Sequence, residues 1–340
     1  IIFVYSNQSH ISTILIDPFV SRPGMIGASG PSHVRTDAVD KYILNDLNLN
    51  KLKAILVAHE HYDHVMDVPY IVASLGLRNP QRQLPALVGS ANLPELFLAY
   101  QRSYPDVTKM FVSDEARSRA RVRDIPWARD PRGYEARVRA YANSLAHVVD
   151  VSPQAQDEGH IIFVGDFGRF RISAIPGAHP EYDLRIVSML TQNVGKIEGT
   201  KIKAPMVATS EYKALHNASI AYVIEYAADD GKVFRILAVE GPSFKHSKLV
   251  KSHFGEIDLM LQGISCRDKH IGGLEESIRT ISPKYFVPTH YDDFFKGLHT
   301  VNDARFPIPK TDKKILGVDL DFSKLHAFLP WFDQRFSDTI

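Results

Sequence analysis

Short apolar runs separated by turn-forming residues characterise the start of the chain. The segments IIFVY (1–5) and TILIDPF (13–19) are rich in β-branched and aromatic residues, and the SNQSH between them favours a turn. KAILVAH (53–59) and ALVGS (86–90) are further short runs of the same kind. These patterns predict four strands within the first hundred residues.

The second half of the chain predicts two β-hairpins. In residues 160–179, apolar residues alternate with charged or small ones around the turn sequence GDFG. Residues 219–241 repeat this pattern, with ADDG between two apolar runs. The pattern further along predicts a strand in IDLMLQGIS (257–265), a helix in LEESIRTIS (274–282), and a strand that runs into a loop in KYFVPTHYDDFF (284–295).

Two segments interrupt this β-rich pattern. Residues 92–158 contain LPELFLAYQRSYP and GYEARVRAYANSLAHVVDV, which have helical spacing, with an arginine-rich stretch between them. We interpret this segment as a helical insertion, and residues 180–218 as a second insertion, in a single domain that spans residues 1–340. Residues 301–340 form a C-terminal tail. Hairpins with interspersed helices predict an α/β fold in which two packed sheets are flanked by helices.

Composition sets broad limits on the class of protein. Of 340 residues, 44% are hydrophobic and 23% are charged, which is typical of a soluble globular protein with a sizeable core. The formal charge of +1 argues neither for nor against a nucleic-acid partner. The single cysteine, Cys266, excludes an intrachain disulfide and a thiolate zinc site. No apolar run is long enough to span a bilayer. No signal peptide is visible, so a cytoplasmic location is slightly favoured, although an N-terminal leader could be missing.

The densest cluster of candidate metal ligands lies in AILVAHEHYDHVMD (54–67), where an apolar run that predicts a buried strand is followed directly by histidines and acids. Such a cluster is costly to bury unless a cation binds it. His59, His61 and His64 are ligands that zinc, iron and manganese accept, and Asp63 offers an oxygen. His59 and His61 can face one ion, whereas the adjacent Asp63 and His64 diverge and can serve a second. This loop could therefore supply half of two metal sites.

The pattern H-x-H-x-D-H after an apolar strand resembles the metallo-β-lactamase superfamily. The other motifs of that family can be matched at predicted strand ends: Asp17 in TILIDPF, His179 in SAIPGAH and His290 in YFVPTHYDDFF. The family's metal-bridging acid normally stands in a GD context. The matching residue here is Glu240 in FRILAVEGPSF, whose side chain is one methylene longer.

The resemblance implies an αββα sandwich with a helical insertion, and two divalent metal ions as cofactors. Zinc is expected first, with manganese or iron as alternatives. The implied ligands are His59, His61 and His179 for one ion, and Asp63, His64 and His290 for the other, with Glu240 as the bridge. Asp63 and Glu240 are also the implied catalytic carboxylates.

Several residues have weaker assignments around this centre. Asp17 is expected to orient a ligand through a hydrogen bond. Asp67 is a weaker candidate for the same role, or is simply a surface acid. His246, His270 and Tyr291 are candidates for contacts with a substrate, because their loops follow strands that are expected near the metals.

Hydrolysis is the reaction class that this centre implies. Two close cations lower the pKa of a shared water to about 7, and the metal-bound hydroxide can attack an ester, lactone or phosphodiester. His61 occupies the position where flavodiiron-type members carry glutamate, which favours the hydrolase branch. HEHYDH together with VPTHYDDFF looks most like the lactonases and the phospholipase D that cleaves N-acyl-phosphatidylethanolamine. The alternatives are a mononuclear iron dioxygenase of persulfide type and a catalytically decayed metal-binding scaffold.

The insertions and the tail bear on substrate and partner. A small-molecule substrate is expected, and the insertions over the metal site are expected to select it. The arginines between 117 and 123 could recruit an anion, although a solvated charged face is the favoured interpretation. The aromatic tail is expected to pack on its own domain, and a homo-oligomer contact is the alternative.

Overall fold

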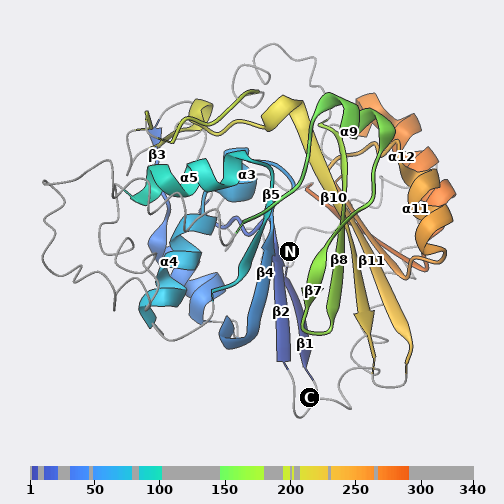
Figure 1. Cartoon of the computed structure of the whole chain (residues 1–340), viewed down its shortest axis with the longest axis horizontal. Coiled ribbons are helices and arrows are strands. Elements are labelled where there is room, and N and C mark those ends of the chain that lie inside the picture. Colours follow the sequence, from blue (N-terminus) through green and yellow to red (C-terminus); the bar gives the residue numbers. More distant parts are fainter. Residues whose placement is uncertain are drawn as a thin grey trace, which may run out of the picture. The chain divides into compact units, whose positions relative to one another are not determined.

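The computed structural model describes most of the first 290 residues (Figure 1). The described residues are 2–6, 11–21, 31–45, 49–78, 84–101, 146–179, 194–199, 201–202, 207–228, 231–263 and 267–290. The arginines between 117 and 123, Cys266, Tyr291 and the tail 301–340 lie outside them. The chain forms two compact units: unit 1 comprises Ile1–Ile2, Ile14–Val148 and Met189–Leu215, and unit 2 comprises Phe3–Thr13, Val149–Ser188 and His216–Ile340.

The first sheet has five strands in the order β1-β2-β4-β5-β6. Their bounds are β1 (Ile2–Ser6), β2 (Ile11–Ile16), β4 (Leu52–Leu56), β5 (Ala86–Gly89) and β6 (Ala146–Val148). The four strands predicted in the first hundred residues are confirmed. β4 and β5 pair in parallel, so the loops that follow Leu56 and Gly89 leave the sheet at the same edge.

Unit 1 also contains helices and helical turns, most of which pack against this sheet. They are α2 (Thr36–Val39), η1 (Asp40–Asn45), η2 (Leu49–Lys51), α3 (Tyr62–Val65), α4 (Val68–Arg78), α5 (Asn92–Gln101) and η5 (Thr209–Glu211), while β3 (Pro31–Ser32) and β9 (Val207–Ala208) form a separate antiparallel pair. Ile55 and Leu87 from the strands share a core with Ile71 of α4 and Phe97 of α5. Most of α4 is buried, so its sequence lacks the polar face that would have predicted a helix.

One predicted helix is wrong at its end. The helical spacing of GYEARVRAYANSLAHVVDV extends to residue 151, but Ala146–Val148 is the strand β6, which pairs in parallel with β5. Residues 133–145 of that segment lie outside the described residues. The β-branched Val148 and Val149 favour an extended backbone, and pairing with β5 provides hydrogen bonds along one side of the strand.

The second sheet, in unit 2, has six strands in the order β13-β12-β11-β10-β8-β7. Their bounds are β7 (Ile162–Phe167), β8 (Phe170–Ala178), β10 (Ala218–Ala227), β11 (Val233–Val239), β12 (Leu259–Gly263) and β13 (Tyr285–Thr289), and the turn η6 (Leu215–Asn217) precedes β10. Both predicted hairpins are confirmed, because β7 pairs antiparallel with β8 and β10 pairs antiparallel with β11.

The directions of the strands determine which residues lie together at one edge of this sheet. β8 and β11 are both antiparallel to β10, so they run in the same direction. β12 pairs in parallel with both β11 and β13. The carboxyl ends of β8, β11 and β13 therefore all lie at the same edge.

The helices of unit 2 are α9 (Pro153–Glu158), α11 (Ser247–Phe254) and α12 (Arg267–Ile281). The helices α11 and α12 lie side by side along the sheet (Figure 1). Val250 and Phe254 of α11 share a core with Leu237, Met260 and Ile281. None of the helices in the described ranges combines the length and the apolar character that a membrane crossing needs.

A buried asparagine joins distant segments of unit 1. The Asn92 Nδ2 group donates to the carbonyl oxygens of Gly195 (2.9 Å) and Lys213 (2.7 Å). Its Oδ1 atom accepts a hydrogen bond from the Ile197 N–H at 2.9 Å. The first turn of α5 is thereby connected to segments more than one hundred residues further along the chain.

We expect Asn92→Ala to lower the free energy of unfolding by about 2–4 kcal/mol, because it leaves buried backbone groups without partners. Asn92→Asp should be at least as harmful, since a carboxylate would then face two carbonyl oxygens. Urea denaturation measures both, with the exposed Asn45→Ala as control. An Asn92→Asp variant as stable as the wild type would contradict this account.

Candidate metal centre

The loop after β4 holds its histidines inside unit 1. The Val57 N–H continues the sheet by donating to Val88 O at 2.8 Å, and the chain then leaves the strand. His59, His61 and His64 are all at least 95% buried. The start of the short helix α3 places His64 one turn beyond His61, since the His64 N–H donates to the His61 carbonyl.

His59 and His61 face one another. The Nε2 atom of His59 lies 2.9 Å from the Nδ1 atom of His61, and the two rings are nearly perpendicular. Two imidazoles on one tetrahedral zinc ion, at about 2.0–2.1 Å each, place their nitrogens about 3.3 Å apart. The observed separation is close to this value, so the pair fits a shared divalent cation.

Asp17 is in position to orient His64. Its Oδ2 atom lies 3.0 Å from Nδ1 of His64, and its Oδ1 atom accepts the Ala58 N–H at 2.8 Å. A carboxylate beside Nδ1 favours the tautomer with the proton there, which leaves Nε2 of His64 as a ligand atom. That Nε2 atom lies 3.6 Å from Asp63 Oδ2. The backbone of Asp17 has a φ of 44°, uncommon for a residue other than glycine.

Glu60, between the two facing histidines, was not among the predicted site residues. Its carboxylate accepts the Ser90 N–H at 3.0 Å and the Ser90 hydroxyl at 2.8 Å. Ser90 Oγ in turn accepts the Asn92 N–H at 3.1 Å. Burial raises the pKa of Glu60 to about 7. The histidine loop is thus connected through Ser90 to the start of α5. In the sequence, the one sign that Glu60 belongs to the site was its position between two histidines.

Asp67 is fully buried, so its interpretation as a surface acid is wrong. Its carboxylate accepts the N–H groups of Val20 (2.6 Å) and Ser21 (2.9 Å) and also the Ser21 hydroxyl. These contacts fix the chain that follows Asp17. Burial raises the pKa of Asp67 to about 6.

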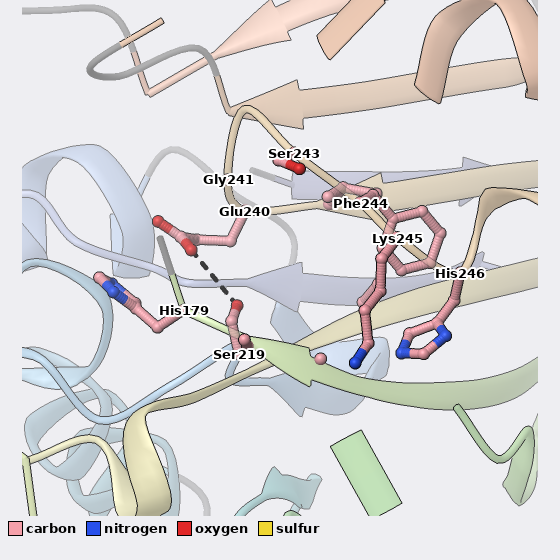
Figure 2. Close-up of a pocket in the computed structure, with 12 residues that line it drawn as sticks. His179, Ser219, Glu240, Gly241, Ser243, Phe244, Lys245 and His246 are labelled. Carbon is pink, nitrogen blue, oxygen red and sulfur yellow. Dashed lines mark hydrogen bonds between the residues drawn. The ribbon is translucent and has the colours of Figure 1, made fainter. Parts of the chain in front are cut away.

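The predicted residues of unit 2 follow three strands whose ends share one edge. His179 follows β8, Glu240 follows β11 and His290 follows β13. The His179 N–H donates to Asn217 O at 2.8 Å. His290 Nε2 lies 4.0 Å from Glu240 Oε1. The Ser219 hydroxyl donates to the other oxygen of Glu240 at 3.3 Å, as Figure 2 shows.

The turn at Glu240 depends on a glycine in the neighbouring strand. A Cβ atom at Gly263 would lie 1.4 Å from the Glu240 carbonyl oxygen, so only glycine allows this approach. The Gln262 Nε2 group donates to Gly241 O at 3.1 Å and ties the turn to β12. The predictions missed Ser219, Gln262 and Gly263, because their roles arise from pairing between strands.

Of the three residues predicted to contact a substrate, the structure describes the surroundings of His246 in most detail. His246 is buried, with Nε2 2.8 Å from Gln156 O, and burial lowers its pKa. Its ring packs on Gly159, where any Cβ atom would overlap the ring. His270 lies in α12, and Tyr291 lies outside the described residues.

The described part of the chain therefore contains His, Asp and Glu groups that could hold a metal ion. Unit 1 brings His59, His61, Asp63 and His64 together, with Asp17 beside them. Unit 2 places His179, Glu240 and His290 along one sheet edge. Imidazole nitrogens and carboxylate oxygens are the ligands that zinc, iron and manganese accept.

The buried carboxyl of Asp67 should give unfolding a measurable pH dependence. Because its pKa is raised from 3.8 to about 6, the folded chain keeps this proton to a higher pH than the unfolded chain. The contribution of Asp67 to stability should therefore fall, by about 2–3 kcal/mol, between pH 4 and pH 6.

Urea denaturation of metal-free wild type and Asp67→Asn across this pH range measures the effect as a difference. The exposed Asp37→Asn variant is the control, because its neighbour Arg35 lowers the pKa of Asp37 and the sign should be opposite. A difference between wild type and Asp67→Asn that rises with pH would contradict this interpretation of the burial.

Comparison with known proteins agrees with these observations. A family profile described as the Metallo-beta-lactamase superfamily matches residues 8–198, more than half of the chain. No curated protein sequence matches the chain. Eighteen chains of solved structure match it. One is human tRNase Z, short form (ELAC1), with 11% identity, coverage of 86% of each chain and a TM-score of 0.42. The two sheets and their helices agree with the predicted fold, and the family profile covers more than half of the chain. The chain belongs to the metallo-beta-lactamase superfamily.

Proposed function

We propose that this protein is a dinuclear-metal-dependent hydrolase that acts on an ester, lactone or phosphodiester. The observation that carries the proposal is the pair of buried imidazole nitrogens, His59 Nε2 and His61 Nδ1, that face each other at 2.9 Å. The two neutral rings share a hydrogen bond at this distance, and the same two nitrogens are placed where both could bind one cation. The hydrolytic members of the superfamily give the reaction class.

The proposed ligands come from both units. His59, His61, Asp63 and His64 come from the loop after β4, and His179, Glu240 and His290 come from the sheet edge of unit 2. In this assignment His59, His61 and His179 hold one ion, and Asp63, His64 and His290 hold the other. Zinc is the first choice of metal, with manganese or iron as alternatives.

Glu240 is proposed as the bridging ligand because of its place in the sheet. β11 lies two strands from β8 and two strands from β13. Neighbouring strands are about 4.7–4.9 Å apart, so the backbone of Glu240 is about 10 Å from those of His179 and His290 along the edge. A central, buried carboxylate with two oxygens suits contact with both ions.

The residues around the ligands hold them in their binding geometry. Asp17 Oδ2 lies 3.0 Å from Nδ1 of His64 and favours the tautomer with the proton there, and the Ser219 hydroxyl donates to one oxygen of Glu240. Two divalent ions, when bound, would supply an activated water at neutral pH and would polarise the bond to be cleaved. The lactonase and phospholipase D-like branch is the narrower proposal, supported by HEHYDH and VPTHYDDFF.

Metal content and hydrolysis test this proposal together. Protein purified without chelator or histidine tag should contain about two zinc or manganese ions per chain by mass spectrometry. It should also hydrolyse members of a panel of carboxylic esters, lactones and bis(4-nitrophenyl) phosphate. His61→Ala should lose at least one ion and lower turnover by at least about 100-fold, while the exposed His33→Ala should retain both properties. A single iron ion without hydrolysis would favour oxygen chemistry instead.

The bridging role of Glu240 has its own test. We expect Glu240→Gln to lower turnover by about 100-fold or more and to reduce metal content towards one ion, because an amide is a weaker ligand for two cations. Glu225→Gln on β10 is the matched control, since Glu225 pairs with Arg235 instead. Unchanged turnover and two retained ions in Glu240→Gln would make this residue structural.

A further inference from the structure

A pocket in unit 2 extends from two of the proposed ligands to a lysine. It has a volume of about 290 Å³, and it is lined by His179 and Glu240 and also by Ser219 and Lys245. Figure 2 shows the side chains of His179 and Glu240 on one side of the pocket and those of Lys245 and His246 on the other, with Ser219 between them. The pocket therefore has a ligand-bearing end and a cationic end.

Small residues keep the strand surface between these ends open. Gly177, Ala178 and Ala221 of β8 and β10 contribute to the lining. The Ser219 hydroxyl is directed towards Glu240, to which it donates a hydrogen bond at 3.3 Å. A group that enters from the side of His179 and Glu240 would therefore pass over these small residues and Ser219 before it reaches Lys245.

Lys245 is the one lysine or arginine among the described lining residues. Its Nζ atom lies 2.8 Å from Asp157 Oδ1, with side-chain exposures of 48% and 83% respectively. Such an exposed ion pair contributes little to stability, so its ammonium can bind another anion at low cost. His246 cannot replace it as a fixed charge, because burial favours the neutral imidazole.

We propose that this pocket binds an anionic oxygen group of the substrate, a carboxylate or phosphate, on Lys245. The scissile bond then lies at the ions beside His179 and Glu240, so the inference rests on the proposed function. The negative charge of Glu240 does not oppose this, because it is compensated when Glu240 binds cations. The volume is at the small end for ligand pockets, which suits an acidic substituent better than a whole large substrate.

Two esters that differ only at the far end test this inference. 4-Nitrophenyl hydrogen glutarate ends in a carboxylate, and 4-nitrophenyl valerate has a methyl group in the same place. With metal-loaded protein, Lys245→Met should raise KM for the glutarate ester about tenfold, because a charge-assisted hydrogen bond is lost. KM for the valerate ester and kcat for both should stay within about twofold.

Three further variants separate a local contact from general electrostatics. Lys248→Met removes the same charge from the exposed side of α11, outside the pocket lining, and should leave both KM values unchanged. Lys245→Arg should retain most of the preference for the glutarate ester, because the charge remains. Asp157→Asn should lower KM for the glutarate ester, since it removes the competing carboxylate. An equal change in KM for the two esters in Lys245→Met, or no change, overturns the inference.

A binding measurement keeps this inference distinct from the proposed function. If the metal-loaded wild type hydrolyses neither ester nor any other substrate of the panel, the proposed function fails. Calorimetric titration of the metal-loaded full chain with glutarate and with inorganic phosphate then tests whether the pocket binds an anion. Binding that weakens about tenfold in Lys245→Met, but not in Lys248→Met, supports an anion site. Equal binding by wild type and Lys245→Met, or no binding by the wild type, overturns it.

Discussion

The structure of unit 1 near its sheet edge depends on the cost of burying three imidazoles and several carboxylates together. His59, His61 and His64 are removed from water, and each needs a partner that fixes its orientation. Two of the partners in this cluster come from the ends of neighbouring strands. Asp17 lies beside His64, and Ser90 holds the carboxylate of Glu60. The parallel pairing of β4 and β5 makes this arrangement possible, because it brings the chain ends that follow them to one edge.

In unit 2, the directions of the strands bring the proposed ligands together. Residues far apart in the sequence reach one edge because β8, β11 and β13 run the same way. The antiparallel pairing of β10 with both β8 and β11 sets that direction, and parallel pairing through β12 extends it to β13. The site residues therefore depend on topology as much as on their own chemistry. If β10 paired in parallel with one of β8 and β11 and antiparallel with the other, His179 and Glu240 would follow strands that end at opposite edges.

The sequence predicted what local pattern encodes. Alternation and turn residues predicted the strands and both hairpins, and the histidine cluster gave the superfamily. Sequence pattern failed where tertiary contacts decide, as in the buried helix α4 and the edge strand β6. Ser90 and Ser219 could not be identified, because a serine matters only through a partner brought close by folding. The assignment of each ligand to one ion or the other remains a prediction.

Glu240 is one methylene longer than the aspartate that the superfamily normally has at this position, so its surroundings must accommodate a longer side chain. A longer side chain reaches the same ligand position only if the backbone retreats, but here the Glu240 carbonyl lies directly against Gly263. The turn is therefore fixed by close packing and by the Gln262 hydrogen bond to Gly241, and the adjustment must come from the side chain. The Ser219 hydroxyl limits that freedom by binding one carboxylate oxygen. Gly263 thus fixes the backbone of Glu240 through close packing, and Ser219 restrains its carboxylate through a hydrogen bond. Together they limit the conformations of a long acidic side chain.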